Sequence, residues 1–317
     1  MPATKLPNLV LGIDGGATNT AAVLADANTG ATVGRSEAGP SNIQAVGVTA
    51  ALKELNSAVA GAFRAARLTR AQVGAAVLGL AGVDLNEGVE VIRGWADIVQ
   101  LSKKLKVAND ATLLFAAGTP EGWGLAVIAG TGSIAFTRDA EGKTGRAGGW
   151  GYLLGDEGSA FRLGLLGLRA ACRAADGIGD TSSLLPAFLE KLESNDPREF
   201  IPTVYRGSWD KAYIAGLAPV VLEAAAGGDR VALGIVEQET HELARTAAGA
   251  VAAGGLSRDG VPIALAGGLV LRSEFYRSRF LKELGTCGVT PGPVGLVDDP
   301  VVGAVVLARK LLSEREA

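Results

Sequence analysis

The segment from residue 127 to residue 158 carries more glycine than an ordinary core element can accept. It reads VIAGTGSIAFTRDAEGKTGRAGGWGYLLGDEG. This pattern predicts a short apolar strand, a Gly-Thr-Gly turn, a second strand, a polar turn and a glycine-rich loop that opens a helix near Asp156. Glycine serves where backbone turns with positive φ or approaches a ligand, and exposed turn amides bind phosphate. Trp150, Asp156 and Glu157 add an aromatic face and hydroxyl acceptors, so we predict a phosphate site beside a polyol site.

A similar unit lies near the N-terminus. An apolar strand over residues 9–13 leads into the turn DGGATNT, residues 14–20, and a second strand over 21–25 precedes an acidic turn. The same succession of strand, Gly/Thr turn, strand and acidic turn therefore occurs twice, which predicts a duplicated domain. Asp14 follows a buried strand directly, and a carboxylate in that position needs a partner or a cation.

Composition limits the class of protein. The 317 residues favour two domains, and 48% hydrophobic with 20% charged residues is typical of a globular chain. A net charge of −3 without a basic block argues against nucleic-acid binding. Cys172 and Cys287 form no CxxC or zinc spacing, which favours a reduced, cytoplasmic protein in which they are buried small residues. No signal-peptide pattern or uninterrupted bilayer-length apolar run is present, so we expect a soluble protein.

Strands and helices alternate along the rest of the chain, which predicts an α/β fold. Further strands are expected over residues 73–80, 105–110 and 263–266, the last followed by Gly267 and Gly268. We expect helices over residues 48–68, 88–99, 111–117, 157–175, 182–192, 211–226, 231–252 and 273–284, and a closing helix that ends at 312.

Two polar residues at the ends of these elements have two interpretations each. Asp110 follows a short strand and precedes a helix, so it is either an N-cap or a catalytic carboxylate at the carboxyl end of the sheet. Asn42 follows a Gly-Pro-Ser turn and is either a turn or cap residue or a ligand contact. The residues alone leave both choices open.

Three other patterns indicate no site. Residues 130–135 fit a G-x-G-x-x-A dinucleotide motif, but the β-branched and aromatic residues that follow favour a hairpin. The Gly-Lys-Thr at 142–144 lacks the first glycine of a P-loop and is predicted to be a hairpin turn. His241 is the single histidine, which excludes histidine triads and histidine-rich metal sites.

Taken together, these motifs resemble the actin/hexokinase/heat-shock-70 ATPase superfamily over nearly the whole chain. The order of GTGS and GGWGYLLGDEGS resembles the bacterial N-acetylglucosamine kinase group, in the family that also holds the benzoyl-CoA reductase activating ATPases. The resemblance implies duplicated ribonuclease H-like (actin-like ATPase) α/β domains around a central cleft. The expected domains are residues 1–115 with 300–317, and residues 116–299.

The resemblance also implies roles for individual residues. Asp110 would be the catalytic base, and Asp14 would hold Mg²⁺. Sugar contacts would come from Asn42, Asn109, Asp110, Gly132, Gly149, Trp150 and Asp156. ATP contacts would come from Gly15, Gly16, Thr18, Asn19, Thr131, Gly132, Ser133, Gly267, Gly268 and Ser273. Ala17 and Asn19 depart from the DGGGTK pattern of this kinase group, which leaves nucleotide affinity and preference open.

The implied function is an ATP-dependent kinase that transfers the γ-phosphoryl group to the 6-hydroxyl of N-acetylglucosamine or a close amino sugar. A glucosamine or N-acetylmuramic acid kinase is the alternative in the same class. An ATPase that activates an iron–sulfur reductase is the alternative in another class, although its relatives carry cysteines in glycine-rich turns. A sugar-sensing repressor would need a DNA-binding extension, and this chain begins at its first strand. The kinase is expected to be a homodimer.

Overall fold

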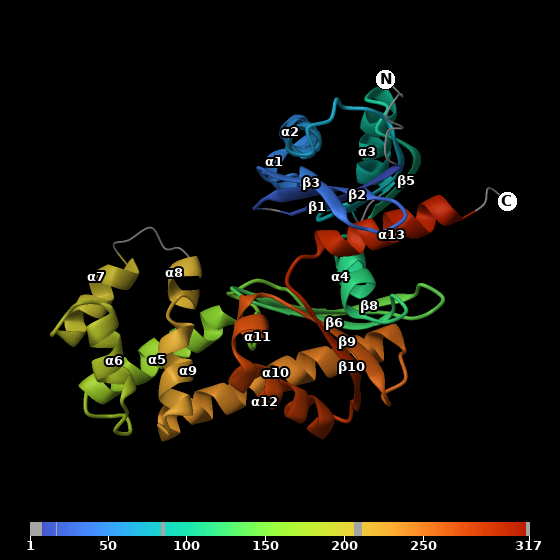
Figure 1. Ribbon diagram of the computed structural model, residues 1–317. Coiled ribbons are helices and arrows are strands. Elements are labelled where there is room, and N and C mark those ends of the chain that lie inside the picture. Colours follow the sequence, from blue (N-terminus) through green and yellow to red (C-terminus); the bar gives the residue numbers. More distant parts are fainter. Residues whose placement is uncertain (1–7, 17, 84–85, 206–210, 315–317) are drawn as a thin grey trace. The chain divides into compact units, whose positions relative to one another are not determined.

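The computed structural model describes residues 8–16, 18–83, 86–205 and 211–314. The chain forms two compact units (Figure 1). The first comprises Met1–Gly122 together with Asp299–Ala317, and the second comprises Trp123–Asp298. Each unit is built on its own five-stranded sheet.

The first unit contains β1 (Leu9–Gly15), β2 (Thr20–Asp26), β3 (Thr32–Ala38), α1 (Ile43–Val46), α2 (Val48–Ala65), β4 (Val73–Leu80), α3 (Asn86–Ile98), β5 (Ser102–Ala108), α4 (Ala111–Gly118) and α13 (Val301–Ser313). The second unit contains β6 (Gly124–Ala129), β7 (Ser133–Arg138), β8 (Thr144–Gly148), α5 (Ala160–Ala175), α6 (Leu184–Lys191), the 3-10 helix η1 (Pro197–Glu199), α7 (Phe200–Tyr205), α8 (Lys211–Ala215), α9 (Ala218–Ala226), α10 (Arg230–Gly254), β9 (Val261–Ala266), α11 (Gly268–Arg272), α12 (Glu274–Thr286) and β10 (Pro291–Val297).

The two sheets have the same topology. Their strand orders are β3-β2-β1-β4-β5 and β8-β7-β6-β9-β10. In each, the first three strands in sequence form an antiparallel meander, and the last two pair in parallel beside its first strand. The duplication predicted from the repeated hairpins is confirmed, and the fold is that of a duplicated ribonuclease H-like, actin-like ATPase.

Both faces of the first sheet are buried, because its central strands are apolar on alternate residues. Leu9, Leu11 and Ile13 of β1 pack in one cluster with the apolar stripes of α2 and α3. Val10, between them, packs on the opposite face against α13. Alternation along one strand therefore places two layers of helices around this sheet.

The core of the second unit lies on one face of its sheet. Leu125, Val127 and Ala129 of β6 contribute alternate side chains to it. The 25-residue helix α10 lies along this sheet beside α12 (Figure 1). This core holds the glycine-rich turns at the ends of β6 and β9 in fixed positions.

Several boundaries differ from the sequence prediction. Strands β3, β8 and β10 were not predicted, and the helix expected to open near Asp156 begins at Ala160. The helix expected over residues 211–226 is two helices, α8 and α9, separated at Gly216 and Leu217. The dinucleotide-like motif leads into β7, and Gly142 lies in the turn between β7 and β8, so both hairpin predictions are confirmed.

The cysteine prediction is wrong in part, because Cys172 on α5 is exposed, whereas Cys287 is half-buried. Among the residues described, no helix combines the length and the apolar character needed to cross a membrane.

Candidate functional site

The Gly-Thr-Gly turn between β6 and β7 is fixed by backbone contacts to the loop before α5. Gly130 N donates to Gly132 O at 2.9 Å and closes the turn. Ala160 N donates to Gly130 O at 2.8 Å. The hydroxyl of Ser133 donates to Glu157 O at 2.6 Å. The turn and the loop that ends at α5 therefore form one rigid unit, although they are separated in sequence.

A second glycine turn lies directly against the first. Gly267 follows β9, the parallel neighbour of β6, and has φ of +95°. A Cβ at this position would lie 2.5 Å from Ala129 O and 2.9 Å from Gly130 N, so only glycine fits. The structure thus brings together the predicted phosphate turn and the predicted adenosine-side turn.

A cavity of about 570 Å³ opens beside these turns. Of the residues predicted for ATP, Thr131, Gly268 and Ser273 line it. The opposite wall comes from α8 and α9, with Ala215, Gly216, Ala218, Pro219 and Leu222. The lining therefore combines the backbone of the Gly-Thr-Gly turn, an apolar surface and the charged residues Arg272 and Glu223, which suits a ligand with an anionic part and a flat apolar part.

The α8–α9 wall was missed in the sequence prediction. Its signal was present, because small residues cluster around Gly216 and Pro219 follows shortly after. A proline in a predicted helix marks a break or a first turn. Here Pro219 lies in the first turn of α9.

Asp156 lies against the first glycine turn. Its side chain is 4% exposed. Its Oδ1 accepts from Ser133 N at 3.3 Å, and its Oδ2 accepts from Lys211 Nζ at 2.6 Å. The residue has φ of +61°, a conformation that aspartate and asparagine adopt more readily than most residues. A carboxylate is thus held in contact with the turn predicted to bind phosphate.

The backbone beside Asp156 is anchored by a buried polar cluster. Glu239 of α10, which is fully buried, accepts from Gly158 N at 2.8 Å and pairs with Arg162 at 3.2 Å. The hydroxyl of Tyr276 donates to Gly158 O at 2.8 Å. Burial, and secondarily the charge of Glu239, raises the pKa of Tyr276 well above 10, so this phenol stays a donor at neutral pH.

We expect Glu239→Ala to destabilise the protein by about 3–5 kcal/mol, because it leaves the partly buried Arg162 and the Gly158 amide without their acceptor. Urea denaturation, followed through the unfolding transition of the second unit, would measure this loss in the free energy of unfolding. Glu242→Ala, which removes an exposed Glu242–Arg245 pair on the same helix, is the matched control and should change stability by less than about 1 kcal/mol. Equal effects in the two variants would contradict an anchoring role for Glu239.

The predicted aromatic contact lies on an exposed loop. Gly149 has φ of +70°, and a Cβ there would lie 2.4 Å from the Ile134 side chain. Trp150 is 71% exposed, with the Arg146 guanidinium 5.8 Å from its ring centroid. Arg146 also donates to Gly149 O at 3.0 Å. The indole face is therefore presented outward from a loop that Arg146 fixes.

The other predicted residues belong to the first unit. Gly15 is buried at the end of β1, and Gly16 O accepts from Ser41 N and Asn42 N at 3.1 and 3.2 Å. Thr18 and Asn19 are exposed in the turn. Ala17, on which one departure from the family pattern falls, lies outside the described residues. The turn that follows β1 is therefore tied by hydrogen bonds to the loop that carries Asn42.

Asn42 and Asp110 both act as helix caps. Asn42 Oδ1 accepts from Gln44 N at 3.0 Å and from Ala45 N at 3.2 Å, which caps α1. Asp110 precedes α4, and its Oδ1 accepts from Ala111 N at 2.9 Å, as does Asn109 Oδ1. The capping interpretation is correct for both residues, and it leaves a ligand role open, because each side chain has a second polar atom.

Carboxylates gather at one edge of the first sheet. Asp14 is the penultimate residue of β1 and Asp110 follows β5, which run parallel with β4 between them, so both lie at the carboxyl-terminal edge of this sheet. Burial, followed by the charges of Asp110 and Asp299, raises the pKa of Asp14 from 3.8 to about 6, against the opposing effect of Arg35. A cation at this edge would relieve that repulsion.

The raised pKa of Asp14 makes stability depend on pH in a testable way. Because the pKa of Asp14 is raised by folding, its neutral form contributes to the stability of the folded protein. This contribution is fully present below pH 3.8 and is lost as the pH rises through about 6. We expect the melting temperature of Asp14→Asn, in EDTA, to exceed that of the wild type at pH 7.5 and the difference to vanish near pH 4. Differential scanning fluorimetry across pH 4–8 measures this, and parallel curves for the two proteins would contradict it.

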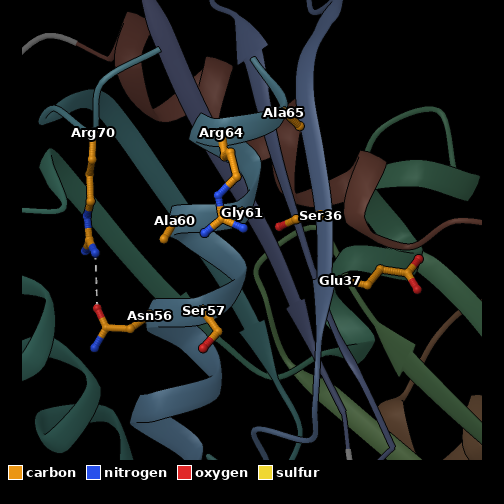
Figure 2. Close-up of a pocket in the computed structure, with 9 residues that line it drawn as sticks. All are labelled: Ser36, Glu37, Asn56, Ser57, Ala60, Gly61, Arg64, Ala65 and Arg70. Atoms are coloured by element: carbon orange, nitrogen blue, oxygen red, sulfur yellow. Dashed lines mark hydrogen bonds between the residues drawn. The ribbon is translucent and has the colours of Figure 1, made fainter. Parts of the chain in front are cut away.

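A different hollow in the first unit lies away from all these residues (Figure 2). It is lined by part of α2 and β3 and by Arg70, which follows α2 in the chain. Arg70 Nη1 donates to Asn56 Oδ1 at 3.2 Å, and Arg64 extends beside Gly61. None of the predicted site residues lines it. Within the described part of the chain, no group of three or more His, Cys, Asp or Glu side chains is placed to hold a metal by itself.

Comparisons with known proteins show which proteins this chain resembles. The chain is 31% identical over 232 residues to the N-acetylmuramic acid/N-acetylglucosamine kinase of Clostridium acetobutylicum, covering 73% of this chain and 76% of that protein. It is 30% identical to the N-acetyl-D-glucosamine kinase of Dictyostelium discoideum, covering 95% and 97% of the two chains.

A solved structure extends this similarity to the fold. A Chromobacterium violaceum protein assigned as an N-acetylglucosamine kinase superposes with a TM-score of 0.66 at 28% identity, covering 97% of this chain and 99% of that chain. The model of one protein family matches residues 11–308. The chain therefore belongs to the BadF/BadG/BcrA/BcrD ATPase family.

Proposed function

We propose that this protein is an ATP-dependent kinase that phosphorylates the 6-hydroxyl of N-acetylglucosamine. The observation that carries the proposal is the contact between Ser133 N and Asp156 Oδ1 at 3.3 Å. This contact joins a backbone turn suited to phosphate with a buried carboxylate suited to sugar hydroxyls. A phosphoryl donor and a polyol acceptor bound at these two groups would be neighbours.

The chemistry requires alignment and charge stabilisation more than covalent catalysis. Asp110 would accept the proton of the 6-hydroxyl as its oxygen attacks the γ-phosphorus. Amides of the two glycine turns would bind phosphate oxygens, and the apolar α8–α9 wall would hold the adenosine. Asn42, Asn109, Gly149 and Trp150 would complete the sugar contacts, with the exposed indole under the sugar ring.

Asp14 would hold Mg²⁺. The donor set fits this ion, because Mg²⁺ keeps several waters and uses one or two carboxylates with substrate phosphates rather than an all-protein cage. Burial and, after it, the charges of Asp110 and Asp299 raise the pKa of Asp14, and a divalent cation would offset the repulsion between these carboxylates. When bound, the ion would neutralise charge on the phosphate oxygens.

N-Acetylglucosamine is the preferred substrate in this proposal because the names of both curated relatives include it. The test measures ADP release with ATP and Mg²⁺ against N-acetylglucosamine, N-acetylmuramic acid, glucosamine, N-acetylmannosamine and glucose. A strong response to N-acetylglucosamine supports the proposal. A response only to glucosamine or N-acetylmuramic acid would move the assignment to that sugar.

A sugar-independent ATPase rate would instead favour an activator of an iron–sulfur reductase. Such a protein holds its cluster through cysteines in glycine-rich turns, whereas Cys172 lies within α5 and Cys287 caps the end of α12. Iron analysis of an anaerobic preparation tests this alternative directly. An iron-free, colourless protein with sugar-dependent activity would exclude it.

We also propose a homodimer in the cytoplasm, where ATP is available. The exposed apolar side chains of Leu153 and Leu154, which are 80% and 79% exposed in the single chain, support an interface near the Trp150 loop. Light scattering after gel filtration would give the mass in solution. A monomeric mass at micromolar concentration would contradict the dimer.

A further inference from the structure

Lys211 has a position that neither the sequence prediction nor the proposed reaction uses. It begins α8, and the next residue, Ala212, lines the 570 Å³ cavity together with Thr131 of the first glycine turn. The lysine is therefore next in sequence to the cavity wall, although it is not itself a lining residue. Its position follows from the helix that forms the wall, so the wall and the ammonium are placed together.

The ammonium of Lys211 is held from three sides. Its Nζ donates to Asp156 Oδ2 at 2.6 Å. It lies 5.9 Å from the centroid of the Tyr152 ring, within the range of a cation–π contact. A Cβ added to Gly132 would lie 2.9 Å from Nζ, so the ammonium packs directly on the backbone of the turn. Only a residue without a side chain at 132 allows this approach.

The buried Asp156 carboxylate needs a cation beside it, and Arg272 of α11, which lines the cavity, supplies a further positive charge to the site. Neither residues 14–20 nor residues 130–133 include a lysine or an arginine. Asp156 contacts the turn at residues 130–133 and adds a negative charge there, which would repel a nucleotide phosphate. Lys211 neutralises that carboxylate and adds a donor with more than one N–H.

Exposure shows which member of the pair an incoming anion would meet. The Lys211 side chain is 30% exposed, whereas that of Asp156 is 4% exposed. The Arg162–Glu239 pair nearby is similar, with side chains 28% and 0% exposed, but there Glu239 of α10 accepts the backbone amide of Gly158 and anchors the loop before α5. The ammonium of Lys211 is the more exposed member of the pair and lies beside the backbone of Gly132, so a phosphate bound at this turn would meet the cation rather than the carboxylate.

We propose that Lys211 is a phosphate-binding residue of the nucleotide site, positioned by Asp156 and contacting the phosphates that bind at the Gly130–Ser133 turn. The role rests on the proposed function only in the identity of the ligand as a nucleotide. It adds a point charge to the backbone donors of this turn. The lysine therefore makes the binding affinity depend on the number of phosphates in the nucleotide and not on its base.

The test compares the binding of adenosine, AMP and ADP, without sugar, to the wild type, Lys211→Met, Lys211→Arg and the exposed control Lys191→Met by isothermal calorimetry. We expect Lys211→Met to weaken ADP binding about 10- to 100-fold and to leave adenosine binding within about twofold. Lys211→Arg should retain most of the preference for ADP over adenosine, and Lys191→Met should match the wild type. A fluorimetric melt of each variant confirms that it is folded.

Two outcomes would overturn the proposal. One is unchanged ADP binding in Lys211→Met, and the other is an equal loss of ADP and adenosine binding, which would mean that the lysine only supports the cavity wall. Because these measurements use no sugar and no turnover, they give an answer even if the protein phosphorylates none of the sugars tested. A failed sugar panel with a lost ADP preference in Lys211→Met would refute the kinase and retain the phosphate contact.

Discussion

Replacing Asp110 by asparagine is expected to lower kcat about 10²- to 10⁴-fold without unfolding the protein. Asparagine caps a helix as well as aspartate does, so the contact to Ala111 N that begins α4 is preserved. The amide cannot accept the proton of the attacking hydroxyl, so only proton transfer is removed. Steady-state kinetics with N-acetylglucosamine, together with a thermal melt, measures both parts of the prediction.

Asp97→Asn is the matched control, because Asp97 is an exposed aspartate near the end of α3 and is none of the predicted site residues. It should keep kcat within about twofold. A second readout is the pH profile, since Asp110 is one of the charges that raise the pKa of Asp14. The acid limb of any residual activity should move to lower pH in Asp110→Asn. Near-normal turnover in this variant would refute the assignment of the base.

Replacing Asp156 by asparagine is expected to raise the KM for the sugar by about 10- to 100-fold, with a smaller change in kcat. The estimate corresponds to a hydrogen bond from a ligand hydroxyl to a charged acceptor, about 1.5–3 kcal/mol. Asparagine tolerates the φ of +61° at this position, so the loop conformation is retained. Kinetics at saturating ATP, with sugar varied, measures the effect.

The exposed Asp176 at the end of α5 provides the control variant Asp176→Asn, which should bind sugar as the wild type does. The ATP concentration series adds a second comparison. If Asp156 holds Lys211 in place, Asp156→Asn should also raise the KM for ATP, but by less than Lys211→Met does. A sugar KM that stays at the wild-type value would remove Asp156 from the sugar site.

The parts of the fold that were predicted correctly are those whose signal is local. Both hairpins, β1–β2 and β6–β7, show apolar runs interrupted by glycine turns, and the amphipathic helices α2 and α10 show regular spacing of apolar residues. The strands that were missed, β3, β8 and β10, are all edge strands. An edge strand is half solvated, so residues such as those of β10, PGPVGLV, carry little of the apolar alternation that marks a strand.

The candidate site shows a similar limit. Asp156 was identified from its own motif, but its partner Lys211 lies 55 residues further along the chain, and no spacing rule links the two. Glu239, which anchors Gly158, is 81 residues away and looks like any polar residue of an amphipathic helix. Local patterns therefore identified groups that could contact a ligand, whereas their supporting partners depend on packing between distant segments.

Helix α13 has a consequence for how the protein is made. Its residues Val301, Ala304 and Ala308 complete one of the two cores of the first unit, although every other element of that unit precedes residue 119. During synthesis, the second unit is a continuous segment and can fold as soon as it emerges. The first sheet instead waits, with the apolar face of Val10, Val23 and Val77 uncovered, until the last helix leaves the ribosome. Chaperones that bind apolar strands could therefore meet this face of the first sheet until residues 301–308 have been made.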